Sequence, residues 1–97
     1  MEFIQILEIR TSNIDKVRAL DDEWRAATER TRTLRRSILC QDRNDKNRYL
    51  VFAFFDSPES ATVNSDLPAT SAFANQMNAI VDAPLQFQDL DVVEDRT

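Results

Sequence analysis

The sequence predicts one α+β domain, residues 1–97, whose strands and helices follow the order β-α-β-β-α-β. Three observations predict this order. Apolar side chains alternate along residues 2–10, an amphipathic stripe runs through residues 13–29, and the segment RYLVFAFF, residues 48–55, is apolar on both of its sides if it is a strand. A chain of this length has room for one modest core, which favours a single domain.

Residues 2–10 form the first predicted strand. The alternation places Phe3, Leu7 and Ile9 on one face and Ile4 and Ile6 on the other. Both faces of this strand therefore need to be covered by other parts of the protein.

Residues 13–29 form the first predicted helix. Ser12 or Asn13 serves as its N-cap, and Asp15 favours a start there because the helix dipole attracts negative charge to the first turn. Its apolar residues recur at spacings of three and four, which is typical of a helix with one face against a core. They are Ile14, Val17, Leu20, Trp24 and Ala27.

A hairpin follows the helix. Residues 33–41 form its first strand, with Leu34, Ile38 and Cys40 on one face, and RYLVFAFF forms the second, antiparallel strand. The polar segment QDRNDKN, residues 41–47, connects them. Because the chain has no glycine, we expect its Asn and Asp residues to adopt the left-handed backbone conformation in this turn.

A second helical region begins at Ser57, an N-cap followed by Pro58 at the first helical position. This short helix runs to about Asn64. Pro68 then restarts the helix, and the segment Asp82-Ala83-Pro84 ends it. The apolar stripe of the restarted part consists of Phe73, Met77, Ile80 and Val81.

Residues 86–94 are the last predicted strand, and residues 95–97 are expected to fray. This order is the split βαβ arrangement of ferredoxin-like proteins, a four-stranded antiparallel sheet with the helices on one face. The other face stays open, although two of the strands are apolar there too. We expect a second copy to cover it, sheet against sheet, through a two-fold axis. The alternative is that one face is only half buried, with Tyr49 and Ala53 at the surface.

The composition narrows the partners and the location. A net charge of −5 disfavours binding to nucleic acid, and no apolar run approaches the length that a membrane span requires. The segment MEFIQILEIR has no features of a secretion signal, and Cys40, the single cysteine, cannot form an internal disulfide. We therefore expect a cytoplasmic protein that binds neither nucleic acid nor membranes.

The chain also contains no glycine and no histidine. Phosphate-binding loops, the dinucleotide-binding fingerprint and the nucleophile elbow all use glycine where the backbone turns sharply or approaches a ligand. Without histidine there is no Ser-His-Asp or Cys-His catalysis, no histidine-ligated zinc and no histidine-held heme. Carboxylates, Lys, Arg, Tyr, Asn and Cys40 remain as candidate catalytic groups.

One segment departs from the acidic character of the chain. RTRTLRR, residues 30–36, carries four arginines. Its functional interpretation is an anion-binding regulatory site, and its structural interpretation is a solvated helix end that runs into a strand with outward charges.

Several segments resemble the dimeric α+β barrel superfamily, which includes antibiotic-biosynthesis-type monooxygenases. They are DEWRAATE followed by RTLRRSILCQDR, then NRYLVFAFFDSPESA, and NSDLPATSAFANQM leading into APLQFQDLDVVED. The last pair is similar to a group of small bacterial proteins of this class. The resemblance covers nearly the whole chain and implies a homodimer in which two sheets form a barrel, with a pocket in each subunit between helices and sheet.

The resemblance also bears on activity. Heme-degrading members use a histidine as iron ligand, which this chain lacks. Members that oxygenate without a cofactor use Asn, Trp, Tyr and Arg side chains in an apolar pocket, where the substrate's own electrons reduce oxygen. We therefore expect no organic cofactor. We expect no metal either, because Asp89 and Asp91 alone do not form a metal site.

Arg36 and Asn64 are the candidate catalytic residues, as groups that stabilise an enolate or phenolate. Each has a structural alternative, since Arg36 could pair with a carboxylate and Asn64 could cap a helix. Trp24 is either a pocket wall or a core residue, and Gln5 and Tyr49 either contact a ligand or satisfy local hydrogen bonds. The candidate pocket residues are Gln5, Trp24, Tyr49, Phe52, Phe54, Phe73 and Met77.

Two functions remain at this stage. The first is a cofactor-free monooxygenase or isomerase that acts on an aromatic or polyketide-like substrate. The second is a non-catalytic dimer that binds a small apolar molecule or takes part in a stress response. A cavity that is open rather than packed solid would favour the first.

Overall fold

The computed structural model describes residues 1–97 and consists of one four-stranded sheet and three helices. The strands are β1 (Phe3–Arg10), β2 (Arg36–Asp42), β3 (Asp45–Phe55) and β4 (Gln86–Asp91). The helices are α1 (Ile14–Ala27), α2 (Pro58–Ser65) and α3 (Pro68–Ile80).

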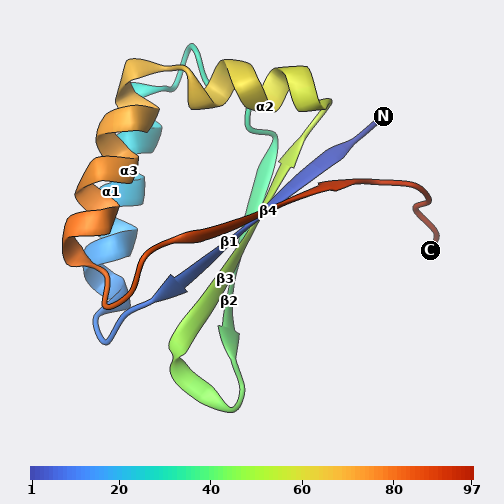
Figure 1. Ribbon diagram of the computed structural model, residues 1–97. Coiled ribbons are helices and arrows are strands. Elements are labelled where there is room, and N and C mark those ends of the chain that lie inside the picture. The colour runs from blue at the N-terminus through green and yellow to red at the C-terminus, as the bar shows by residue number, and fades with distance from the viewer.

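The sheet is antiparallel throughout and has the strand order β2-β3-β1-β4. The helices lie on one side of it, with α1 and α3 side by side (Figure 1). The predicted ferredoxin-like fold is therefore confirmed. The second helical region is divided into α2 and α3 because Pro68 begins a new helix after the turn at Asp66 and Leu67.

The strand registers define the two faces of the sheet. Ile4 is paired with Phe54 and Ile6 with Phe52, and residues directly opposite each other share a face. Arg36 and Ile38 of β2 pair with the same two phenylalanines. These side chains lie on the helix-free face, which we define by Ile4, Ile6, Arg36, Ile38, Cys40, Leu50, Phe52 and Phe54.

The predicted start of the second strand is wrong. The strand begins at Arg36 rather than at residue 33, and Leu34 packs against Phe3 and Phe55 on the helical side. The prediction placed Leu34 and Ile38 on the same face because it assumed regular alternation from residue 33 onward. The segment before Arg36 is not part of the strand, so that alternation does not extend to Leu34.

The predicted turn between β2 and β3 is too long. The turn consists of Arg43 and Asn44, between the paired residues Asp42 and Asp45, and no residue of the chain has a positive φ angle. A register shift between Gln41 and Asp42 accompanies the tight turn in place of left-handed residues. The carboxylate of Asp42 accepts a hydrogen bond from the Asn44 backbone N–H at 2.7 Å, which fixes the turn.

The helix starts differ in how they are capped. The hydroxyl of Ser57 accepts a hydrogen bond from the Ser60 backbone N–H at 3.1 Å, as an N-cap of α2 should. Asn13 occupies the N-cap position of α1 but makes no side-chain cap bond. Instead, the Thr11 hydroxyl accepts from the Asn13 backbone N–H at 3.0 Å, so the chain is held two residues before the N-cap.

The core is small and divided. Only 10 of the 97 residues are buried, and six of the seven buried apolar residues form two separate clusters. Phe3, Phe55 and Ala61 form one cluster, whereas Ile9, Val17 and Met77 form the other. A chain whose core is split in this way has space between the clusters, and the candidate site lies there. None of the helices has the length and the apolar run needed to cross a membrane.

Candidate functional site

A cavity of about 380 Å³ lies between the helices and the sheet. Its wall contains 23 residues, of which 14 are hydrophobic, and they come from all three helices and all four strands. Phe55 of one core cluster and Ile9, Val17 and Met77 of the other line it. The cavity therefore occupies the gap between the two clusters and has the size and the mainly apolar lining of a small-molecule site.

Aromatic side chains form the side of the cavity nearest the helices. The rings of Trp24 on α1 and Phe73 on α3 lie 5.9 Å apart, and both residues line the cavity. The indole N–H of Trp24 donates a hydrogen bond to the Thr70 hydroxyl at 2.9 Å. This bond satisfies the polar atom of a nearly buried residue, so Trp24 offers the cavity an apolar ring held in one orientation.

Asn64, near the end of α2, is the one nearly buried amide in the cavity wall. Its side-chain oxygen accepts a hydrogen bond from the Thr33 backbone N–H at 3.3 Å. Because a backbone N–H can only donate, this bond identifies the accepting atom as the amide oxygen and fixes the orientation of the side-chain amide. The amide nitrogen makes no hydrogen bond. Asn64 is only 6% exposed, and its nitrogen is not sealed from accessible space. The amide N–H groups of this cavity-lining residue therefore make no hydrogen bond within the protein.

A second polar group lies on the side of β2. The Arg25 guanidinium donates to the Asp21 carboxylate at 2.8 Å and to the Ser37 hydroxyl at 2.7 Å. Asp21 and Arg25 are four residues apart on α1, whereas Ser37 belongs to β2, so this contact joins the helix to the edge strand. All three residues line the cavity, as does Arg18 on the same helix.

The cavity is open at the edges of the sheet. Leu39 on β2 and Phe87 on β4 line it, although they are 43% and 55% exposed. Gln5 lines it from β1 and donates through its side-chain nitrogen to the Asp89 carboxylate of β4 at 3.1 Å. The exposure of Leu39 and Phe87 therefore leaves the cavity in contact with solvent at both edge strands.

The structure brings together five of the residues predicted for the site. Gln5, Trp24, Asn64, Phe73 and Met77 all line the cavity. For Trp24 both earlier interpretations hold, since it packs against its neighbours and forms part of the cavity wall.

The structure places the other four predicted residues elsewhere. Arg36, Phe52 and Phe54 lie on the helix-free face, where the Arg36 guanidinium sits 5.4 Å from the centre of the Phe54 ring. Tyr49 is on the helical side but packs against the cluster around Ile9, outside the cavity wall. The prediction grouped aromatic residues of RYLVFAFF without regard to alternation, which sends consecutive side chains to opposite faces.

The arginines of residues 30–36 do not gather on one surface. The Arg35 guanidinium pairs with the Asp56 carboxylate at 2.6 Å, and that of Arg36 turns to the helix-free face. Arg32 donates to the Arg25 carbonyl at 2.9 Å and lies over the Trp24 ring. These three side chains bind to separate parts of the protein.

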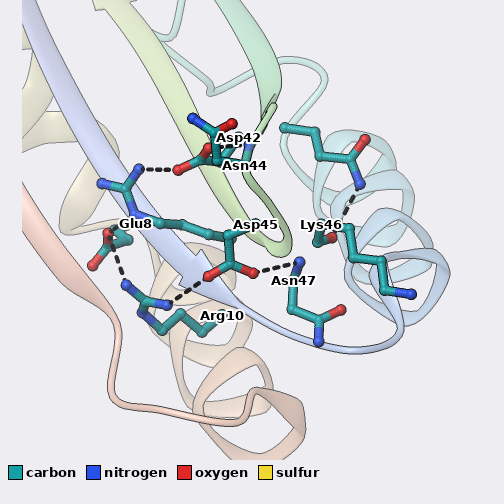
Figure 2. Close-up of polar contacts among 9 residues, drawn as sticks. Glu8, Arg10, Asp42, Asn44, Asp45, Lys46 and Asn47 are labelled. Carbon is teal, nitrogen blue, oxygen red and sulfur yellow. Dashed lines mark hydrogen bonds and ion pairs between the residues drawn. The ribbon is translucent and has the colours of Figure 1, made fainter.

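A charged cluster occupies the turn end of the β2–β3 hairpin. Glu8, Arg10 and Asp45 interact there, together with Asp42 and Arg48 (Figure 2). Hydrogen bonds from the Asn44 backbone N–H and from Arg48 lower the pKa of Asp42, and bonds to Glu8 and Asp42 raise the pKa of Arg48. None of these residues lines the cavity, so the cluster stabilises the hairpin and takes no part in the site.

Sequence reasoning missed seven polar residues of the cavity wall: Arg18, Asp21, Arg25, Ser37, Ser65, Thr70 and Ser71. A signal existed for three of them. Arg18, Asp21 and Arg25 follow one another at spacings of three and four residues, directly beside the apolar stripe that contains Val17 and Trp24. Polar residues at such a boundary lie at the edge of a buried face. Nothing in the sequence indicated that Ser37 would meet Arg25, because that contact depends on the register of β2.

The side chains present give no indication of a metal centre. The protein has no group of three or more cysteine and carboxylate side chains that could hold an ion together. The expectations that the protein needs neither a metal nor an organic cofactor stay predictions.

Solved structures with the same fold are numerous, although no family model and no curated protein matches the sequence. Rv0793 from Mycobacterium tuberculosis is similar with a TM-score of 0.79 and 15% identity, over 100% of both chains. A variant of SnoaB, a cofactor-independent oxygenase from Streptomyces nogalater, has a TM-score of 0.81 and 13% identity, over 97% of this chain and 95% of that one.

A third structure is described as an antibiotic biosynthesis monooxygenase. It has a TM-score of 0.73 and 14% identity, over 97% of this chain and 100% of the other. The chain therefore has the fold of antibiotic biosynthesis monooxygenase-like proteins, as the sequence resemblance implied.

Proposed function

We propose that the protein is a homodimer that binds a small aromatic molecule in the cavity of each subunit and oxidises it without a cofactor. The observation that supports this proposal most directly is the cavity of about 380 Å³, lined by Trp24, Phe73 and Asn64, whose amide nitrogen has no hydrogen-bond partner. The likeness to a structure described as a cofactor-independent oxygenase favours the same chemistry. Isomerisation of a similar substrate would use the same groups.

The helix-free face supports the homodimer. Six apolar residues of that face are only partly buried in the single chain, and no helix covers them: Ile4, Ile6, Ile38, Leu50, Phe52 and Phe54. A contiguous apolar surface of this kind is typical of an interface, and two copies related by a two-fold axis bury it with one contact. The proposed location is the cytoplasm, where Cys40 stays reduced.

The proposed reaction assigns Asn64 a catalytic role. A hydroquinone that releases a phenolic proton to water is electron-rich, and the amide of Asn64 donates a hydrogen bond to its oxyanion. One atom of O₂ enters the ring, the other leaves as water, and the product is a hydroxyquinone. The substrate supplies all the electrons. The mainly apolar wall lowers the local dielectric constant, which strengthens the hydrogen bond to the oxyanion.

A non-catalytic dimer that carries an aromatic ligand is the second candidate. It is supported by the absence of a free carboxylate in the cavity wall. Asp21 is the one acidic residue there, and its carboxylate is already bound to Arg25. A reaction that begins with proton removal by the protein lacks a free general base, whereas binding alone requires none.

The test is the incubation of the pure protein with a panel of hydroquinones under isotopically labelled O₂. We expect labelled hydroxyquinone above the background of autoxidation, which gives the unsubstituted quinone and peroxide instead. Asn64→Ala should lower the rate about a hundredfold, the effect of removing one oxyanion donor. Mass spectrometry of the products measures how much labelled oxygen has entered the hydroxyquinone.

Asn78→Ala is the matched control, because Asn78 is exposed on α3 and outside the cavity wall. It should leave the rate unchanged. Binding of hydroquinones with no labelled product from any of them would exclude the oxygenase and leave the carrier.

A further inference from the structure

We infer that the ligand of the cavity is a monoanion, an elongated aromatic molecule whose carboxylate or phenolate binds at Arg18. This inference rests on the proposed ligand-binding function and adds the charge and orientation of the molecule. It depends on the charge balance of the cavity wall, on the partners of each charged residue, and on the position of Arg18 along α1.

The wall contains three charged residues, Arg18, Asp21 and Arg25, and its net charge is therefore +1. The whole chain has a net charge of −5. An acidic protein that lines an apolar cavity with a surplus of positive charge has a local potential that favours an anion over a neutral molecule or a cation.

The surplus charge belongs to Arg18. Arg25 is neutralised by the Asp21 carboxylate at 2.8 Å and is further held by Ser37 at 2.7 Å. Arg18 makes no hydrogen bond, and no carboxylate oxygen lies within 4.0 Å of its guanidinium, although Asp22 is four residues away on the same helix. A guanidinium offers five N–H donors in a fork that fits two oxygen atoms of one anion.

The position of Arg18 gives the orientation and the approximate length of the ligand. Arg18 and Ala27, the last residue of α1, are nine residues apart, or about 14 Å along the helix axis. Asn64 binds the Thr33 backbone beyond that end of the helix. A ligand that uses both residues therefore has an anionic group at one end, a hydrogen-bond acceptor near the other, and an apolar body that passes Trp24 and Phe73.

Arg25 acts as a positioning residue in this arrangement. Two of its five N–H donors bind Asp21 and Ser37 and join α1 to β2, so its charge is held away from the ligand's anionic group. The carboxylate of Asp21 is likewise engaged and repels the anion less than a free carboxylate would. Arg18 is the one charged residue of the wall without a partner, so the anionic group is directed to it.

The experiment compares two probes by calorimetry: biphenyl with a para-carboxylate, and the neutral carboxamide of the same shape. We expect the carboxylate to bind more tightly to the unmodified protein. Arg18→Gln should weaken carboxylate binding roughly two- to fivefold, the modest effect of an exposed charge, and leave carboxamide binding unchanged. Arg18→Lys should retain most of the preference, and added salt should reduce it.

Arg43→Gln is the matched control. Arg43 is exposed in the β2–β3 turn, away from the cavity, and its replacement by Gln changes the net charge by the same amount as Arg18→Gln does. It should alter neither affinity. Because Arg18 is exposed, its substitution should also leave the thermal melt of the protein unchanged.

The outcomes separate this inference from the proposed function. If both probes bind and Arg18→Gln weakens them equally, or weakens neither, the role of Arg18 is overturned while the ligand-binding cavity stands. If neither probe binds, the cavity is not a site for aromatic molecules, and both the proposed function and the inference fail.

Discussion

At the scale of single residues, Asp42 has the most distinctive electrostatic environment. The Asn44 backbone N–H and the Arg48 guanidinium both donate to its carboxylate, at 2.7 Å and 3.0 Å, and they lower its pKa. A carboxylate with a lowered pKa in the folded state stabilises that state above its pKa in the unfolded chain. The stabilisation disappears as the pH falls through the folded-state pKa.

Asp42→Asn should therefore change the pH dependence of stability. The variant keeps an oxygen that accepts from Asn44 but cannot ionise, so we expect a lower melting temperature than the unmodified protein near neutral pH. The difference should shrink in acid, below the ordinary aspartate pKa of about 3.9, and vanish once Asp42 itself is protonated. Thermal melts followed by circular dichroism over this pH range measure it.

Asp22→Asn provides the comparison, because Asp22 is exposed and forms no ion pair. This variant should melt as the unmodified protein does at every pH. A melting difference for Asp42→Asn that stays the same from neutral to strongly acidic pH would show that the ionised carboxylate does not contribute.

Alternation along a strand determines which single residues could be predicted. The position of Gln5 in the cavity wall follows from the regular alternation of β1 from Phe3. The position of Arg36 could not be derived in this way, because the face of β2 depends on where the strand starts, and Leu34 lies outside it. An error of one residue in the register of a strand moves every side chain to the opposite face of the sheet. For β2, only the pairing with β3 determines the register.

At the scale of elements, local signals were sufficient for the helices. The stripe from Ile14 to Ala27 predicted α1 to within two residues at its end, and Ser57 with Pro58 predicted the start of α2. The hairpin turn was predicted as seven residues but contains two, because the polar residues on both sides of it form strand pairs. A run of polar residues indicates a turn only where its backbone groups do not form hydrogen bonds with a neighbouring strand.

The cap of α2 gives a prediction at this scale. Ser57→Ala removes the hydroxyl that accepts from the Ser60 backbone N–H, so we expect the free energy of unfolding to fall by about 1 kcal/mol. Urea denaturation gives this difference. Ser12→Ala is the control, since the Ser12 hydroxyl makes no hydrogen bond and its loss should be neutral. Equal midpoints for the two variants would mean that the cap contributes nothing to stability.

At the scale of the whole molecule, the helix-free face is the feature that the sequence predicted most directly. Residues 2–10 and 48–55 carry apolar side chains on both faces of their strands, so the sequence predicted that both faces of the sheet would be buried. The helices cover only one of these faces (Figure 1). The cavity itself could not be predicted as an open space. Whether Trp24, Phe73 and Met77 pack solidly depends on the distance between helices and sheet, which periodicity does not determine.

The proposed dimer predicts that Phe52→Lys separates the subunits. Phe52 lies at the centre of the helix-free face, between its partners Ile6 and Ile38, so a charge there would be buried without a partner in the dimer. Sedimentation velocity at micromolar concentration should show the unmodified protein as two copies and the variant as one.

Val63→Lys is the matched substitution, because Val63 is 52% exposed on α2 and lies away from that face. It should sediment as the unmodified protein does. An unmodified protein that sediments as one copy at these concentrations would contradict the proposed assembly.

The division of the core into two clusters has a consequence for the protein in the cell. A molecule that occupies the space between Phe55 and Met77 would touch both clusters at once and supply the packing contacts that the chain itself lacks. Its binding free energy would then add to the folding free energy, by an amount that grows with the logarithm of its concentration. The abundance of the protein would follow the supply of its own ligand, because the empty form would unfold and be degraded more often.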